Sequence, residues 1–127
     1  MTKPDLSGRR IFLVEDEALV AMMIESMIEE LGGTVVATKS GVNEALDFVA
    51  ASHSEIDVAL LDLNLNGKRS YDVAQAASGH GIPVVFATGY ADDDIVETWR
   101  GRPVLAKPFQ LADLEGALAR ALSGPAA

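Results

Sequence analysis

The feature that most constrains the fold is a short apolar run, Val58-Ala59-Leu60-Leu61, that ends in a carboxylate at Asp62. A continuous apolar run of this length is typical of a strand that is buried on both faces, as in a parallel sheet. A side chain at the end of such a strand is held rigidly at the edge of the sheet. In open α/β sheets, ligands bind at the edge formed by the carboxyl ends of the strands. Asp62 is therefore the first candidate for a chemical role.

Similar apolar runs alternate along the chain with segments of helical periodicity. We predict strands at residues 11–14, 34–37, 58–62, 83–87 and 104–106, and helices at residues 18–31, 41–51, 70–78, 92–100 and 111–122. Five β-α units in strict alternation predict a parallel sheet with helices on both faces and right-handed crossovers. Ser40 and Ser70 are candidate helix caps, and residues 65–69 are predicted to form a loop. The buried stripe of the first helix is predicted to be Leu19, Val20, Met23, Ile24, Met27, Ile28 and Leu31.

The length of 127 residues and the hydrophobic share of 49% suit one domain with a core of its own. We expect a flexible leader at residues 1–9, because this segment is polar and contains Pro4 and Gly8. We expect the domain at residues 10–123 and a short tail at residues 124–127. No second domain is expected, so a signalling role would require another protein.

The formal net charge of −9 argues against nucleic acid and anionic membranes as partners, because both carry negative charge themselves. The absence of cysteine excludes disulfides, thiolate catalysis and cysteine-based zinc sites, and it fits a reducing cytoplasm. The first ten residues contain no apolar segment of signal-peptide length, and no apolar run is long enough to span a membrane. We therefore expect a cytoplasmic protein.

Oxygen-bearing residues follow the first and third predicted strands. Glu15 and Asp16 come directly after the first strand, Asp62 ends the third, and Asn64 lies two residues further on. Carboxylates gathered at one sheet edge raise one another's pKa unless a cation lies among them. Mg²⁺ prefers oxygen ligands. Glu15, Asp16, Asp62 and a backbone carbonyl oxygen near Asn64 therefore form a candidate Mg²⁺ site.

The fourth and fifth strands deliver a hydroxyl group and a positive charge, from Thr88 and Lys107. A carboxylate can attack phosphorus and hold the phosphoryl group as an acyl phosphate. The transferred group then needs positive charge and hydrogen-bond donors around its oxygens, which Lys107 and Thr88 could supply. Taken singly, Asp62 and Thr88 would be turn or cap residues, and Lys107 could be either a surface charge or a functional residue. Their placement at different strand ends favours a shared site.

Four motifs follow the strands: Leu13-Val14-Glu15-Asp16-Glu17, Leu61-Asp62-Leu63-Asn64, Ala87-Thr88-Gly89 and Lys107-Pro108-Phe109. In this order and spacing they resemble the receiver domain of two-component response regulators, and the resemblance covers the chain from about Arg10 to Ser123. It implies a flavodoxin-like (βα)5 three-layer sandwich with a parallel sheet of strand order 2-1-3-4-5.

The resemblance also implies a function. Asp62 would take a phosphoryl group from a histidine kinase or a histidine phosphotransfer protein. Asp16 and Asp62 would bind Mg²⁺ with the backbone carbonyl of Asn64, and Glu15 would help through water. Thr88 and Lys107 would hold the phosphoryl oxygens. Such a regulator catalyses only its own phosphorylation and dephosphorylation, and it signals by phosphorylation-dependent binding to a downstream protein or acts as a phosphate sink.

The segment Val85-Phe86-Ala87-Thr88-Gly89-Tyr90 is similar to a subgroup of stand-alone receivers named for a Phe-Ala-Thr-Gly-X-Tyr (FAT GUY) pattern, with Tyr90 directly after Gly89. Many receivers carry an aromatic switch residue at the position held here by Val104, so Tyr90 is a candidate for that role or for packing on the fourth helix. Trp99 is a candidate partner contact if it is exposed and a packing residue if it is buried. Asn66-Gly67 replaces a proline that many receivers carry, which predicts a looser loop and an altered phosphate lifetime.

Three alternative functions share part of this residue pattern. A phosphohydrolase that forms an aspartyl phosphate usually needs an acid two residues after the nucleophile, where this chain has Asn64. A flavodoxin-like cofactor binder needs a donor-rich loop after the first strand to cradle phosphate, and Glu15-Asp16-Glu17 would repel it. A binding module with a degenerate receiver fold, independent of phosphorylation, ranks above these two.

Overall fold

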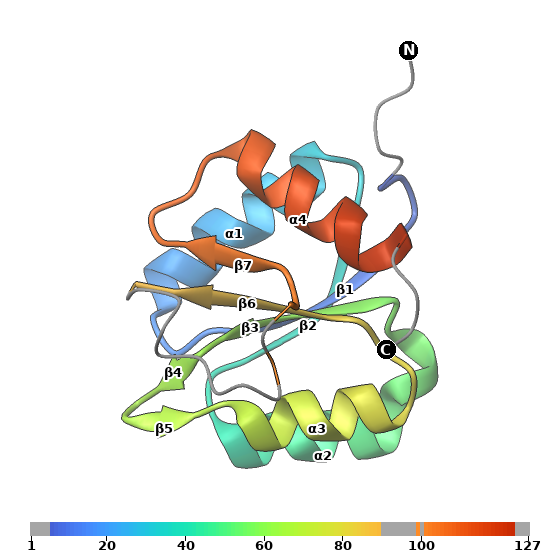
Figure 1. Ribbon diagram of the computed structural model, residues 1–127, viewed down its shortest axis with the longest axis vertical. Coiled ribbons are helices and arrows are strands. Elements are labelled where there is room, and N and C mark those ends of the chain that lie inside the picture. The colour runs from blue at the N-terminus through green and yellow to red at the C-terminus, as the bar shows by residue number, and fades with distance from the viewer. Residues whose placement is uncertain (1–5, 90–98, 100, 124–127) are drawn as a thin grey trace.

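A five-stranded sheet in the order β2-β1-β3-β6-β7 forms the centre of the computed structural model, which describes residues 6–89, 99 and 101–123 (Figure 1). Every strand pairing in this sheet is parallel. The predicted order 2-1-3-4-5 is confirmed, since the additional strands β4 and β5 form a separate hairpin. The strands are β1 (Arg10–Val14), β2 (Thr34–Lys39), β3 (Val58–Asp62), β4 (Asn64–Leu65), β5 (Lys68–Arg69), β6 (Val84–Thr88) and β7 (Val104–Ala106). The helices are α1 (Ala18–Glu30), α2 (Val42–Ser52), the short 3-10 helix η1 (His53–Glu55), α3 (Tyr71–Gly79) and α4 (Leu111–Ser123).

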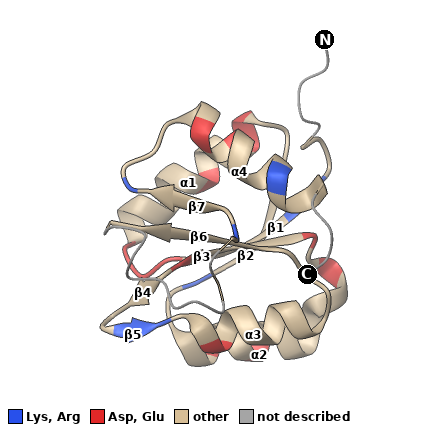
Figure 2. Cartoon of the chain, in the orientation of Figure 1, with Lys and Arg blue, Asp and Glu red and all other residues tan. Residues whose placement is uncertain are grey.

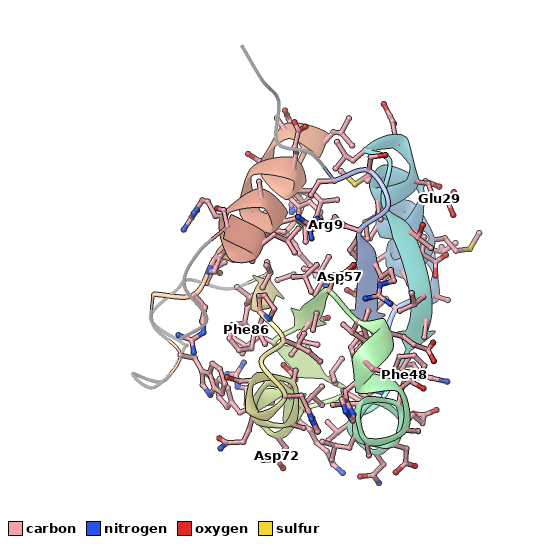
Figure 3. All side chains as sticks on the ribbon, turned by 90° about the vertical axis from the view of Figure 1, so that its right-hand side faces the viewer. Arg9, Glu29, Phe48, Asp57, Asp72 and Phe86 are labelled. Atoms are coloured by element: carbon pink, nitrogen blue, oxygen red, sulfur yellow. The ribbon has the colours of Figure 1, made fainter. Side chains whose placement is uncertain are left out.

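Helices cover both faces of the sheet, α1 and α4 on one and α2 and α3 on the other (Figure 1). Successive side chains of a strand point to opposite faces, so each central strand contributes to two cores. In β1, Phe12 packs toward α2, where its ring lies 4.8 Å from that of Phe48, while Leu13 belongs to the core beneath α1 and α4. Figure 3 shows Phe86 of β6 on the α2 and α3 side of the sheet. The buried apolar runs of the sequence are therefore strands that are covered on both faces.

The buried stripe of α1 differs from the predicted one at two positions. Ile24 and Ile28 are buried as predicted, but Leu19 is 76% and Met23 64% exposed, and neighbouring Met22 is 60% exposed. At 3.6 residues per turn, Leu19 and Met23 lie about 100° or more from the direction of Ile24. A helix face wide enough to include both of them is wider than the sheet and α4 can cover. The assignment of Leu19 and Met23 to the core is therefore wrong.

The packed structure begins before the expected domain boundary at residue 10. Leu6 is 2% exposed and belongs to the core beneath α1 and α4. The backbone N–H of Gly8 donates a hydrogen bond of 3.1 Å to the carbonyl oxygen of Gly32, just after α1. Residues 6–8 are therefore tied to the domain and do not form part of a loose leader.

The segment that was predicted to be a loop after Asp62 is a two-stranded antiparallel hairpin, β4 and β5. Its two central residues have positive φ angles, 53° at Asn66 and 88° at Gly67, as a type I′ turn requires. The Asn-Gly pair therefore forms the turn of a hairpin, and the predicted loop at residues 65–69 is corrected, while the looser segment and the altered phosphate lifetime stay predictions.

Neither predicted serine caps its helix through its side chain. Ser70 is the N-cap residue of α3, but its side chain makes no capping hydrogen bond. The N-cap residue of α2 is Gly41, not Ser40.

Trp99 is buried, with 6% of its surface exposed. Its ring lies edge-on to Phe86 at 5.8 Å, and the guanidinium group of Arg102 lies 5.2 Å from its centroid. These contacts favour packing over a partner-facing role. Tyr90 and most of the predicted helix at residues 92–100 lie outside the described residues. Within the described part of the chain, no helix is long and apolar enough to cross a membrane.

Candidate functional site

The strand register brings four strand ends to one edge of the sheet. Val14 pairs with Leu61, so Glu15 follows β1 where Asp62 ends β3. Asp62 in turn pairs with Ala87 of β6. Thr88 pairs with Ala106 of β7, and Lys107 follows directly. The predicted convergence of residues from β1, β3, β6 and β7 is therefore present.

Lys107 connects the carboxylates of two other strands. Its Nζ donates a hydrogen bond of 2.8 Å to Oε1 of Glu15 and one of 2.9 Å to Oδ2 of Asp62. The backbone N–H of Lys107 donates to the carbonyl oxygen of Thr88 at 2.8 Å, which continues the ladder between β6 and β7 past the last paired residues. The backbone of Lys107 is therefore fixed to β6, and its side chain points into the carboxylate cluster.

Glu15, Asp16 and Asp62 form one carboxylate cluster. Each offers an oxygen, and these oxygens all lie within 4.8 Å of one another. Glu15 is 2% and Asp62 7% exposed, while Asp16 is half-buried. Lys107 provides one positive charge against these three carboxyl groups, so the acids of the cluster outnumber the cation that contacts them. The donor set consists of oxygen only, and it fits Mg²⁺.

The pKa of Glu15 is affected by the same excess of acidic groups. Burial raises the pKa of Glu15 to about 7, and the charge of Asp62 adds to the increase, although hydrogen bonds from Lys107 and from the N–H of Glu17 oppose it. For Lys107, burial by itself would lower the pKa, but the hydrogen bonds to Glu15 and Asp62 outweigh it and raise the pKa. Without a further cation, Glu15 therefore keeps its proton up to about pH 7.

The β4–β5 hairpin supplies backbone groups to the same cluster. The N–H of Asn64 donates to Oδ1 of Asp62 at 3.2 Å, and the N–H of Asn66 donates to Oδ2 of Asp16 at 3.0 Å. Figure 1 shows this hairpin beyond the end of β3, at the edge toward which the arrowheads of β6 and β7 point. In Figure 2 its second strand is basic, because β5 consists of Lys68 and Arg69.

The pairing of β4 with β5 determines the direction of the Asn64 carbonyl group. Ser70 N–H donates to the carbonyl oxygen of Leu63 at 3.0 Å, so the next pair, Asn64 with Arg69, falls at a position without cross-strand hydrogen bonds. Both backbone polar groups of Asn64 then point away from Arg69. Since its N–H bonds to Asp62, its carbonyl oxygen is directed to the same side, toward the carboxylates. This geometry fits the predicted carbonyl ligand.

The structure therefore brings together Glu15, Asp16, Asp62, Asn64 and Lys107, with Thr88 buried at the end of β6. The role of the Asn66 N–H was not anticipated from the sequence. The signal that points to it is the Asn-Gly pair, which is typical of a type I′ hairpin.

The chain matches the family described as response regulator receiver domain over residues 11–119. The transcriptional regulatory protein PdtaR of Mycobacterium tuberculosis is 32% identical over 119 residues, which cover 91% of this chain and 57% of PdtaR. The phyllosphere-induced regulator PhyR of Methylorubrum extorquens is 31% identical over 116 residues, 88% of this chain and 43% of PhyR. The chain thus spans about half the length of the curated relatives it matches.

Among solved structures, the solution structure of SdrG from Sphingomonas melonis Fr1 is 45% identical and has a TM-score of 0.80. The match covers 91% of this chain and 97% of that chain.

Proposed function

The chain belongs to the response regulator receiver family, and on this premise we propose that it accepts a phosphoryl group on Asp62 from a histidine kinase or a histidine phosphotransfer protein. The observation that carries this proposal is the position of Asp62. Its Oδ2 accepts a hydrogen bond from Lys107 at 2.9 Å, and its carboxylate shares one cluster with Glu15 and Asp16. A cytoplasmic regulator of this kind would signal by binding a downstream protein when phosphorylated, or drain phosphate from its kinase.

The transfer forms a bond between a carboxylate oxygen of Asp62 and phosphorus while the phosphorus–nitrogen bond of the donor breaks. The imidazole nitrogen of the donor keeps the electron pair of that bond. Lys107, already beside Asp62, can donate to a phosphoryl oxygen and offset its negative charge. The hydroxyl group of Thr88 is proposed to donate a hydrogen bond to another phosphoryl oxygen.

Four groups would hold Mg²⁺ in this proposal: the carboxylates of Asp16 and Asp62, the carbonyl oxygen of Asn64, and Glu15 through water. The cluster geometry and the direction of the Asn64 carbonyl support it. When bound, the ion supplies positive charge next to the phosphoryl oxygens and lowers the repulsion between donor and acceptor.

A second observation favours a protein as the donor. Leu19, Met22 and Met23 are the exposed large hydrophobic residues of the described chain, and they lie on one face of α1, which begins two residues after Asp16. A donor protein that brings a phosphohistidine to Asp62 must cover the surface around this edge. We propose that it buries these three side chains, which we call the α1 patch.

We also propose that the chain falls in the Phe-Ala-Thr-Gly-X-Tyr subgroup and that Tyr90 takes part in signalling. Val104, which pairs with Phe86 in the sheet, has no aromatic ring whose rotation could report phosphorylation. The Tyr90→Ala variant should keep Asp62 phosphorylation but bind a phosphorylation-dependent partner more weakly. If Tyr90→Ala binds the partner as tightly as the wild type does, Tyr90 serves only in packing.

Nuclear magnetic resonance tests the proposal residue by residue. With Mg²⁺ present, a small phosphodonor such as acetyl phosphate should shift the backbone amide signals of residues 14–17, 62–66, 87–89 and 105–107. Protein carrying Asp62→Asn should lack the shifts caused by the phosphodonor. If both proteins respond alike and bind a partner equally, the chain is a binding module that does not depend on phosphorylation.

A further inference from the structure

The tip of the β4–β5 hairpin contacts a carboxylate from a different strand. Asn66 occupies the left-handed region at φ 53°, and its backbone N–H donates to Oδ2 of Asp16 at 3.0 Å. Among the described residues, this is the only hydrogen bond that reaches the Asp16 carboxylate. The contact joins positions fifty residues apart in the chain, and it is made by the backbone of Asn66, not by its side chain.

The hairpin that makes this contact is anchored at its base. Leu65 is 1% exposed and packs in the core on the α2 and α3 side. Ser70 N–H donates to the carbonyl oxygen of Leu63, and Leu63 N–H donates to that of Ala87 in β6. Asn66 therefore extends from a framework that is part of the sheet and the core.

The hairpin holds two carboxylates of the cluster at once. Along an extended segment, the N–H groups of alternate residues point to the same side. Asn64 N–H reaches Asp62 and Asn66 N–H reaches Asp16, so one edge of the hairpin fixes the acids that end β3 and follow β1. The geometry of the proposed cation site is thus set in part by a turn that contributes only backbone groups.

We propose that the Asn66-Gly67 turn is a positioning element of the cation site. The N–H of Asn66 belongs to the peptide unit that leaves β4, and the left-handed turn reverses the chain directly after it, so that this N–H faces Asp16 and holds that carboxylate in the orientation the cation needs. This inference rests on the proposed function, because it assumes that the cluster binds Mg²⁺. Mg²⁺ demands near-octahedral geometry, and partners that orient a metal ligand typically change metal affinity by about 10- to 100-fold.

Two substitutions at one position separate the backbone from the side chain. Asn66→Val and Asn66→Gly both remove the carboxamide, but glycine adopts positive φ readily and a β-branched residue does not. Gly67→Ala is a third variant, since a Cβ at Gly67 would meet no atom within 4 Å while its φ of 88° is strained for alanine. Any effect of Gly67→Ala therefore comes through the backbone.

The measurement is a Mg²⁺ titration followed by amide chemical shifts. We expect Asn66→Val and Gly67→Ala to raise the Kd for Mg²⁺ about tenfold or more, and Asn66→Gly to stay within about threefold of the wild type. In metal-free wild type and in Asn66→Gly, the amide proton of residue 66 should exchange with solvent more slowly than in Asn66→Val, a readout that needs no cation. Unchanged amide signals from the two cores verify that each variant is folded.

The outcomes distinguish this inference from the function on which it rests. Equal Mg²⁺ affinity in wild type and Asn66→Val, or an equal loss in Asn66→Gly and Asn66→Val, overturns the positioning role and leaves the receiver assignment intact. A wild type that shows no Mg²⁺-dependent shifts at millimolar concentration overturns the cation site itself and the positioning role with it.

Discussion

The ammonium group of Lys107 lies 2.9 Å from Oδ2 of Asp62, although forty-five residues separate the two along the chain. The same Nζ lies 2.8 Å from Oε1 of Glu15, so one cation bridges acids from β1 and β3. Lys107 keeps 19% of its side chain exposed, whereas the side chain of Glu15 is 1% exposed. The bridge is therefore open toward solvent at the lysine, where a phosphoryl group would enter.

Replacing Lys107 should slow the phosphorylation of Asp62 without weakening Mg²⁺ binding. In Lys107→Gln, we expect phosphorylation of Asp62 by a small phosphodonor to slow by about 10²-fold or more, because a positioned donor to the transferring group is lost. Mg²⁺ affinity should not fall, since the cluster becomes more negative. Lys107→Arg keeps the positive charge, so its phosphorylation rate should lie between those of the wild type and Lys107→Gln. A matching loss of Mg²⁺ affinity in Lys107→Gln would instead indicate that the site has collapsed.

The raised pKa of Glu15 predicts an unusual pH dependence in Mg²⁺-free buffer. Its pKa is about 7 in the folded protein, against an ordinary value of 4.5, so the folded state binds a proton in this range that the unfolded state lacks. The free energy of unfolding should therefore decrease as pH rises from about 4.5 to 7, by on the order of 1–3 kcal/mol.

Glu15→Gln removes the titrating group and is the matched control for this effect. Urea unfolding at pH 5, 6 and 7.5 should show a smaller decrease for the variant than for the wild type. Added Mg²⁺ should stabilise the wild type at pH 7.5, because it favours the ionised carboxylate. Parallel pH profiles for the two proteins would show that Glu15 is ionised throughout.

The α1 patch should matter for a protein donor and not for a small one. Leu19→Gln, Met22→Gln and Met23→Gln together should lower the rate of phosphotransfer from the cognate donor protein by roughly tenfold or more, through lost apolar contact area. Phosphorylation by acetyl phosphate should be unchanged. Glu29→Gln with Glu30→Gln, exposed at the other end of α1, is the control. Equal transfer rates for patch and control variants would place the donor elsewhere.

The Arg10–Asp57 pair makes a prediction about stability away from the site. Asp57 accepts hydrogen bonds from the backbone N–H of Arg10 at 2.7 Å and from its Nε and Nη2, each at 3.1 Å. The side-chain hydrogen bond from Arg10 lowers the pKa of Asp57 in the folded protein below its unfolded value of about 3.8. The ionised Asp57 therefore contributes to the free energy of unfolding above that unfolded pKa, and the contribution is lost as pH falls through the folded pKa.

Asp57→Asn should therefore lower the urea midpoint at pH 7, and its difference from the wild type should shrink toward pH 3. Asp47→Asn, at an exposed position of α2, serves as the comparison and should change the midpoint little. If the difference for Asp57→Asn stays constant from pH 7 to pH 3, the ion pair does not account for it.

The sheet and most of the site could be predicted because they depend on patterns that are local in sequence. Apolar runs ending in Asp62 and Thr88 define buried strands, and the parallel arrangement then brings Glu15 and Lys107 to the same edge. The exposure of Leu19 could not be predicted, because apolar spacing shows that a helix face is apolar, not how much of that face the rest of the protein covers. The burial of Leu6 could not be predicted either, because a single apolar residue in a polar segment forms no periodic pattern.

The hairpin contact between Asn66 and Asp16 could not be predicted for a different reason. The Asn-Gly pair indicates the turn, but the hydrogen-bond partner of a backbone N–H has no signature in the sequence. A proline at position 66 would have no N–H to donate. Asparagine at this position therefore supplies a contact to the site that proline could not make.

The most direct test of the central claim is the intact mass of the protein after incubation with acetyl phosphate and Mg²⁺. We expect the wild type to gain the mass of one phosphoryl group, and to gain little when EDTA removes the metal. Protein carrying Asp62→Asn should gain none under the same conditions. A phosphoryl adduct of equal abundance in Asp62→Asn, or no adduct on the wild type even with a competent kinase, would contradict the assignment of Asp62 as the phosphoryl acceptor.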